Sequence, residues 1–134
     1  MALHVCRGNW TPDERVALAG DYRPLLPLLS RVPVGTLFLE MCASRAGEMN
    51  VLLDLPRDRR VGVGLVNQKR AEVERSEDIA RRAEQATAIF GAERVLLCPD
   101  CGFSTFADNP LCSADIAQRK LAALVGAARL LRGA

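Results

Sequence analysis

Two short segments far apart in the sequence carry side chains that could bind a metal ion. His4-Val5-Cys6 places the only histidine two residues before a cysteine, and Cys98-Pro99-Asp100-Cys101-Gly102-Phe103 places two cysteines in a Pro/Gly turn. Thiolate sulfur and imidazole nitrogen are donors that zinc accepts readily. Glu40 is a third candidate, because it ends an apolar run and a buried carboxylate without a partner is costly. The sequence therefore offers a set of donors that could meet around one ion.

His4, Cys6 and Glu40 can each also be explained without a metal ion. His4 and Cys6 could be a hydrogen-bonded core histidine and a buried cysteine, which are common inside proteins. Glu40 could form an ion pair with Arg45 or with another arginine. Because these alternatives explain each residue singly, the metal hypothesis depends on the residues coming together.

The cysteines allow a redox interpretation as well. Cys98 and Cys101 match the Cys-x-x-Cys pattern of a redox dithiol or of half a zinc knuckle. A redox motif of the thioredoxin kind opens a helix soon after a strand, whereas a polar stretch follows here. The sequence has no second Cys-x-x-Cys for a four-sulfur site, and only Cys112 lies nearby. Cys42 and Cys112 receive no role from their spacing and have the size of small apolar fillers.

Composition limits the classes of protein that fit. The 134 residues are 49% hydrophobic and 25% charged, which is typical of one globular domain covering residues 1–134. The net charge of +2, with arginines spread along the chain, predicts neither a nucleic-acid nor a membrane partner. No apolar run approaches the roughly 18 residues of a membrane span, and the N-terminus lacks a signal-peptide pattern. Five cysteines, an odd number, are then expected to be reduced thiols in the cytoplasm.

The elements that must position these residues alternate between strands and helices. A helix start is indicated by Thr11-Pro12-Asp13-Glu14. The glycine pair Gly62-x-Gly64 lies inside a predicted strand, so it indicates close backbone packing and not the turn of a dinucleotide-binding motif. Strands are predicted at 2–6, 36–41 and 60–67 and in the apolar run from Arg94 to the Cys98-Pro99 turn; helices are predicted near 24–31, at 46–55, from a Ser76 cap to Gly91, and from Ser113 or Asp115 onward.

This order predicts an α/β fold of four βα units with parallel strands, either a small open sheet or half of an eight-stranded barrel. Loops at the carboxyl ends of parallel strands build active sites, and His4 and Cys6 share one face of their strand because side chains alternate. Glu40 and Cys101 follow two other strands at the same edge. Whether these side chains meet around one metal ion is the question that this topology raises.

Taken together, these pieces resemble the C-terminal catalytic barrel of cobalamin-independent methionine synthase and its short relatives. No single motif is very specific, but the ordered set covers nearly the whole chain. The matching segments are His4-x-Cys6 with Arg7-Gly8-Asn9, Leu39-Glu40 with Ser44-Arg45, Val61-Gly62-Val63-Gly64-Leu65-Val66 with Lys69 and Glu74, Pro99-Asp100-Cys101-Gly102-Phe103, and Lys120-Leu121 with Val125-x-Ala127-Ala128.

The resemblance implies a zinc ion held by His4, Cys6, Glu40 and Cys101. It also implies transfer of a methyl group from methyltetrahydrofolate to the thiol of homocysteine, in methionine biosynthesis. The fold it implies is the second half of a (βα)8 barrel, because four further units precede this region in the family. Family residues that hold the amino-acid part of homocysteine and most of the folate surface lie in those units, so no catalytic or substrate-binding residue is assigned here.

Two further expectations follow from a half-barrel. Its two edge strands and its inner face would be left open, and the apolar segments Leu3-His4-Val5 and Val95-Leu96-Leu97 contain no proline or lysine to discourage pairing. A homodimer or a companion half-barrel chain would close the barrel. The alternative to a zinc-dependent methyltransferase is a non-catalytic zinc-binding remnant, or one part of a split enzyme.

Overall fold

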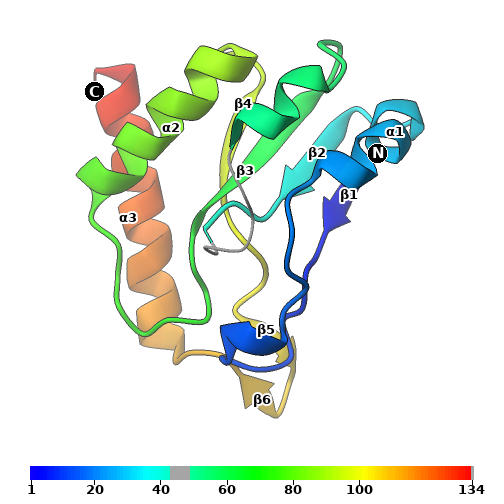
Figure 1. Cartoon of the computed structure of the whole chain (residues 1–134). Helices are drawn as coiled ribbons and strands as arrows, with labels where there is room; N and C mark the ends of the chain where they lie inside the picture. Colours follow the sequence, from blue (N-terminus) through cyan, green and yellow to red (C-terminus); the bar gives the residue numbers. More distant parts are fainter. Residues whose placement is uncertain (43–48, 134) are drawn as a thin grey trace.

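A computed structural model describes residues 1–42 and 49–133 of the chain (Figure 1). Four strands form one parallel sheet in the order β1-β2-β3-β4, which confirms the predicted α/β fold with parallel strands. The strands are β1 (Ala2–Val5), β2 (Thr36–Leu39), β3 (Arg60–Val66) and β4 (Val95–Pro99). The first three end one or two residues earlier than predicted, so Cys6, Glu40 and Asn67 lie just beyond their strands.

Helices connect the strands and cover the sheet. The two long helices, α2 (Ser76–Phe90) and α3 (Ala114–Arg132), lie side by side. Proline at the first turn of α1 (Leu26–Arg31) agrees with the predicted start near Pro24 or Pro27. The remaining helical segments are short 3₁₀ turns: η1 (Glu14–Val16), η2 (Arg23–Leu25) and η3 (Met49–Asp54).

The structure corrects several local predictions. Ser76 does not cap α2: it is the first helical residue, and its hydroxyl donates to the carbonyl of Ala123 on α3 at 3.0 Å. The predicted helix start at 11–14 gives only the single turn η1, capped by the Asp13 side chain. The predicted helix at 46–55 is the 3₁₀ segment η3, and residues 46–48 lie outside the described residues. The polar stretch after Gly102 contains a small hairpin that was not predicted, β5 (Ser104–Phe106) with β6 (Asn109–Pro110).

Alternation along the strands separates two faces of the sheet. Leu37, Val61 and Val63 are fully buried on the helix-covered face. On the other face the ring of Phe38 occupies the space beside Gly62, where an added Cβ would lie 2.1 Å from the ring. The glycine pair in β3 thus serves close packing, as its place within a strand indicated. Helix α2 buries one stripe, which consists of Ile79, Ala80, Ala83, Ala86 and Phe90.

Both edges of the sheet are open within the described residues, because β1 pairs there only with β2 and β4 only with β3. Every residue of β4 is half-buried, although the strand is apolar. Across the same part of the chain, no helix combines the length and the apolar character needed to cross a membrane.

Candidate metal centre

The four predicted ligands come together at the carboxyl ends of the strands. One donor atom from each of His4, Cys6, Glu40 and Cys101 lies within 4.8 Å of the others. The sulfurs of Cys6 and Cys101 are 3.8 Å apart, although 95 residues separate them. Glu40 is buried, Cys101 is half-buried, and His4 and Cys6 are exposed. The cluster is therefore open to solvent on one side.

Strand register explains how three of these residues meet. Val5 pairs with Leu39, so Cys6 and Glu40 occupy equivalent places after neighbouring strands. Cys101 follows β4, which is the opposite edge of the sheet from β1. Three strand spacings in a flat sheet would separate these edges by about 14 Å. The contact between Cys6 and Cys101 thus requires a curved sheet and a loop after β4 that reaches across the strand ends.

Backbone and aromatic groups hold Glu40 in place. The amide of Arg7 donates to Oε1 of Glu40 at 3.2 Å. The hydroxyl of Tyr22 donates to the Glu40 carbonyl at 2.9 Å, and burial raises the pKa of Tyr22, so this hydroxyl keeps its proton. The guanidinium of Arg7 lies 5.5 Å from the Tyr22 ring centre. The predicted alternative, an ion pair with Arg45, lies outside the described residues.

The carboxylate of Asp100 joins two of the ligand loops. Its Oδ1 accepts from the backbone amides of Met41 at 2.8 Å and Cys42 at 2.9 Å, directly after Glu40. Asp100 itself precedes Cys101. An added Cβ at Gly64 would lie 2.0 Å from Oδ1, so only glycine leaves room for this carboxylate. Sequence reasoning assigned no role to Asp100, although it stands beside a candidate ligand in the Pro99-Asp100-Cys101-Gly102-Phe103 segment of the family resemblance.

Two buried amides join the loops after β1, β3 and β4. Asn9 donates to the carbonyl of Gly102 at 2.8 Å, and Gln68 donates to Oδ1 of Asn9 at 2.6 Å. Asn9 is 5% exposed and Gln68 is 2% exposed. Gln68 follows the end of β3 by two positions and Asn9 follows the end of β1 by four. Asn9 also belongs to the Arg7-Gly8-Asn9 segment of the family resemblance, but neither residue received a role from the sequence.

The five cysteines differ in their surroundings. Burial, opposed in part by a hydrogen bond from the backbone of Gly102 and assisted by the neighbouring Cys6, raises the pKa of Cys101 to about 11 in the metal-free protein. Burial raises the pKa of Cys98 to about 12. Cys98 lies outside the four-residue cluster, so the geometry pairs Cys101 with Cys6 and does not favour the Cys-x-x-Cys dithiol. All five thiols are free.

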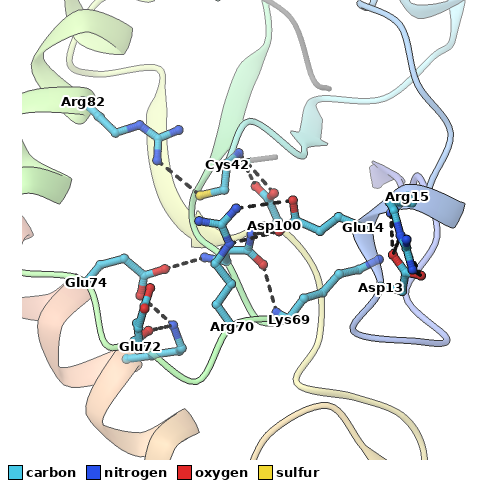
Figure 2. A network of polar contacts seen from close by, with 12 residues as sticks. Asp13, Glu14, Arg15, Cys42, Lys69, Arg70, Glu72, Glu74, Arg82 and Asp100 are labelled. Carbon is cyan, nitrogen blue, oxygen red and sulfur yellow. Dashed lines mark hydrogen bonds and ion pairs between the residues drawn. The ribbon is translucent and has the colours of Figure 1, made fainter. Parts of the chain in front are cut away.

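A polar network fixes the loop that follows β3 (Figure 2). Lys120, which is fully buried on α3, donates to Oε2 of Glu74 at 2.7 Å. Oε1 of Glu74 accepts from the amide of Asn67, and the Asn67 side chain donates to Glu14 at 2.7 Å. Arg70 forms an ion pair with Glu14 at 3.1 Å, and this contact holds the pKa of Glu14 below its usual range. The loop is thereby tied both to α3 and to η1.

Comparison with known proteins adds an independent finding. Residues 15–129 match the family described as cobalamin-independent synthase, catalytic domain. YxjH of Bacillus subtilis, an uncharacterised protein, is 30% identical over 113 residues, which are 83% of this chain and 29% of that protein. A methionine synthase of Saccharolobus solfataricus is 26% identical over 98% of this chain and 34% of its own length. The chain thus spans about a third of the length of these curated relatives.

Solved structures share the fold. The structure of a B12-independent methionine synthase from Shewanella sp. W3-18-1, in complex with selenomethionine, superposes with a TM-score of 0.82 at 24% identity. The match covers 98% of this chain and 38% of that one. A crystal structure of the Listeria monocytogenes protein, titled a vitamin-B12 independent methionine synthase, gives a TM-score of 0.58 at 22% identity. The four βα units therefore have the arrangement of part of a methionine synthase barrel.

Proposed function

The chain belongs to the family of cobalamin-independent synthase catalytic domains, and we propose that it binds one zinc ion and takes part in methyl transfer to a thiol. The proposed ligands are His4, Cys6, Glu40 and Cys101. The observation that carries this proposal is the convergence of their donor atoms within 4.8 Å, with His4 in β1 and the other three just after β1, β2 and β4.

The donor set suits zinc in chemistry and in spacing. One nitrogen, two sulfurs and one oxygen form a mixed set of the kind that zinc binds. Two thiolates at the usual zinc–sulfur distance in a tetrahedral site lie about 3.8 Å apart, and the two sulfurs here are 3.8 Å apart. Burial raises the pKa of Cys101, so its thiol keeps its proton in the metal-free protein. A cation bound to this sulfur would lower the pKa again and favour the thiolate.

The chain's own residues would prepare the site for a thiol substrate. Cys6, Cys101 and Glu40 are anionic as ligands, so their three negative charges would outweigh the two positive charges of a bound zinc ion and would keep a bound thiolate electron-rich. Zinc held there would supply a Lewis acid that lowers the pKa of a substrate thiol. His4 and Cys6 lie on the exposed side of the cluster, where a substrate can enter. The proposed reaction is methyl transfer from a donor such as methyltetrahydrofolate to a thiol such as homocysteine, in methionine biosynthesis.

Metal analysis tests the ligand set. Wild-type protein should hold one zinc per chain after dialysis, and Cys6→Ala or Cys101→Ala should abolish stoichiometric binding. Cys42→Ala is the matched control, because Cys42 contacts Gly64 and Arg82 instead of the cluster. Equal zinc in the wild type and in the Cys6→Ala/Cys101→Ala double variant would refute the assignment. Loss of zinc from Cys98→Ala alone would favour the Cys-x-x-Cys site.

The second candidate function is a zinc-binding part that needs a partner, and the open sheet edges favour it. We propose that β1 and β4 pair with a second half-barrel, in a homodimer or in a complex with a companion chain, since open apolar edges are association sites. Sedimentation of the zinc-loaded protein at micromolar concentration should show a dimer. A stable monomer that transfers no methyl group alone, but does so with a companion protein, would favour the split enzyme.

The proposed compartment is the cytoplasm. The metal site requires Cys6 and Cys101 as thiolates, and a reducing compartment keeps exposed cysteines available for zinc.

A further inference from the structure

A small cavity lies beside the proposed metal centre, and two residues that line it carry buried polar atoms without hydrogen-bond partners in the described part of the chain. These atoms are Oε1 of Gln68 and Nζ of Lys69. We propose that one ordered water in this cavity joins Lys69 and Gln68 to the carboxylate of Glu40, and that Lys69 is thereby a positioning residue for this metal ligand. The inference rests on the proposed function, because Glu40 is one of the proposed zinc ligands.

The cavity lies where three loops meet. Glu14 and Leu18 line it from the segment after β1, Glu40 lines it just after β2, and Gln68 and Lys69 line it from the loop after β3. In Figure 2 the Lys69 side chain runs from this last loop toward the segment that carries Glu14. The cavity measures about 20 Å³, which is room for one water molecule.

Gln68 presents a fixed acceptor to this cavity. Its Nε2 donates to Oδ1 of Asn9 at 2.6 Å, which sets the orientation of the amide and leaves Oε1 as the atom without a partner. Gln68 is only 2% exposed, so bulk solvent does not satisfy this oxygen. Because a buried acceptor without a donor is costly, Oε1 requires a donor from inside the cavity.

Lys69 presents a fixed donor. Its Nζ is buried without an acceptor, whereas its backbone amide donates to Oδ1 of Asn67 at 2.9 Å. Asn67 is in turn held by Glu74 and Glu14, so the backbone that carries Lys69 has a defined position. An ammonium buried in this way requires an acceptor.

Glu40 has the most unused acceptor capacity of the three carboxylates that line the cavity. Asp100 already accepts from two backbone amides, and Glu14 accepts from two side chains. Among the described residues, the Glu40 carboxylate accepts a single hydrogen bond, from the amide of Arg7 at 3.2 Å. Since an ionised carboxylate has about four acceptor sites, Glu40 is the carboxylate that a further donor would serve.

One water satisfies all three groups. The ammonium of Lys69 can only donate, whereas Oε1 of Gln68 and an ionised Glu40 can only accept. A water accepts from Lys69 and donates its two hydrogens to Gln68 and Glu40, which gives the roughly three hydrogen bonds that a buried water typically makes. A bound cation would not replace the water, because a cation offers no acceptor to the ammonium and is repelled by it.

This water would hold the Glu40 carboxylate in place before a metal ion binds. Groups that orient a metal ligand typically change metal affinity about 10- to 100-fold when they are altered. Charge repulsion alone predicts the opposite sign, because removing a cation from beside the site should strengthen zinc binding. The direction of the change in zinc affinity therefore separates a positioning role of Lys69 from a simple effect of its charge.

Zinc competition with a chelator measures that direction. Lys69→Met should weaken zinc binding about tenfold. In a Glu40→Gln background the same change should have little further effect, because Lys69 acts through the Glu40 carboxylate. Arg75→Met is the matched control: it removes a cation from the same loop, one that pairs with the exposed Glu77, and it should leave zinc affinity unchanged.

A high-resolution crystal structure of the metal-free protein tests the water directly. It should show one water within hydrogen-bond distance of Nζ of Lys69, Oε1 of Gln68 and the Glu40 carboxylate. A cavity in which no water joins Lys69 to Glu40 overturns the inference. So does zinc affinity that is equal or higher in Lys69→Met, and so do additive effects of Lys69→Met and Glu40→Gln. Wild-type protein that binds no zinc overturns the proposed function instead, and the crystal structure then decides on the water alone.

Discussion

Replacing Asp100 by asparagine should weaken both the fold and metal binding, although Asp100 is not a proposed ligand. Its carboxylate accepts from the amides of Met41 and Cys42, which follow Glu40, and Asp100 itself directly precedes Cys101. Asparagine keeps the shape and one oxygen, so the two short bonds can persist without the negative charge. The longer contact from Cys42 to Oδ2, at 3.1 Å, would instead face an amide NH₂ group.

The size of the effect follows from the loss of charge. A hydrogen bond to a charged group contributes about 1.5–3 kcal/mol and a neutral one about 0.5–1.5 kcal/mol. Two bonds that each lose about 1 kcal/mol give a destabilisation of about 2 kcal/mol, because Asp100 is only 4% exposed. Groups that orient metal ligands typically change metal affinity by about 10- to 100-fold when they are altered. Zinc affinity should therefore fall at least about tenfold.

Urea unfolding of the metal-free protein and zinc competition with a chelator measure the two effects. Asp108→Asn is the matched control, since the same chemical change on the exposed hairpin turn should cost less than about 0.5 kcal/mol. Gly64→Ala perturbs the same carboxylate from the other side, and its cost in the Asp100→Asn background should be smaller than in the wild type. Unchanged stability and unchanged zinc affinity in Asp100→Asn would refute the reasoning.

Two further predictions concern packing. Glu74→Gln leaves the fully buried Lys120 without its anion and should cost about 3–5 kcal/mol, whereas Lys120→Met leaves a carboxylate that is 25% exposed and should cost about 1–2 kcal/mol. Denaturant midpoints that rank the pair in the opposite order would contradict this asymmetry. Gly62→Ala should cost about 1–3 kcal/mol because its Cβ would meet the Phe38 ring, while Gly35→Ala, with open space around it, should be nearly neutral. Similar melting temperatures for the two alanine variants would contradict that prediction.

The sequence predicted the sheet because its strands are short apolar runs bounded by turn residues. The same patterns failed where local propensity was overruled by tertiary contacts. Ser76 stands at a typical capping position, yet its hydroxyl donates to α3, because the close packing of α2 on α3 offers a carbonyl there. The β5–β6 hairpin lies in a polar stretch without alternation, so hydrophobic periodicity could not mark it.

The candidate site was predictable to the extent that its residues carry unusual chemistry. A lone histidine, two cysteines and a carboxylate in an apolar run attract attention by type, and the family resemblance implies that they converge. Asn9, Gln68 and Asp100 do not attract attention by type, because amides and carboxylates are common in loops and only the structure shows that these three are buried. Their roles depend on three loops meeting, and one sequence does not show which loops meet.

The proposed metal centre and the fold are not independent features of this chain. Cys6 follows one edge strand and Cys101 follows the other, with Glu40 between them. An ion bound to all three would fix the curvature of the sheet and join positions 95 residues apart. Because closing a long loop restricts the unfolded chain more than closing a short one, such a link favours the folded state as well as the site. The hydrogen bonds of Asp100 and Asn9 bring the same loops together without metal, so they reduce the ordering that metal binding still has to supply.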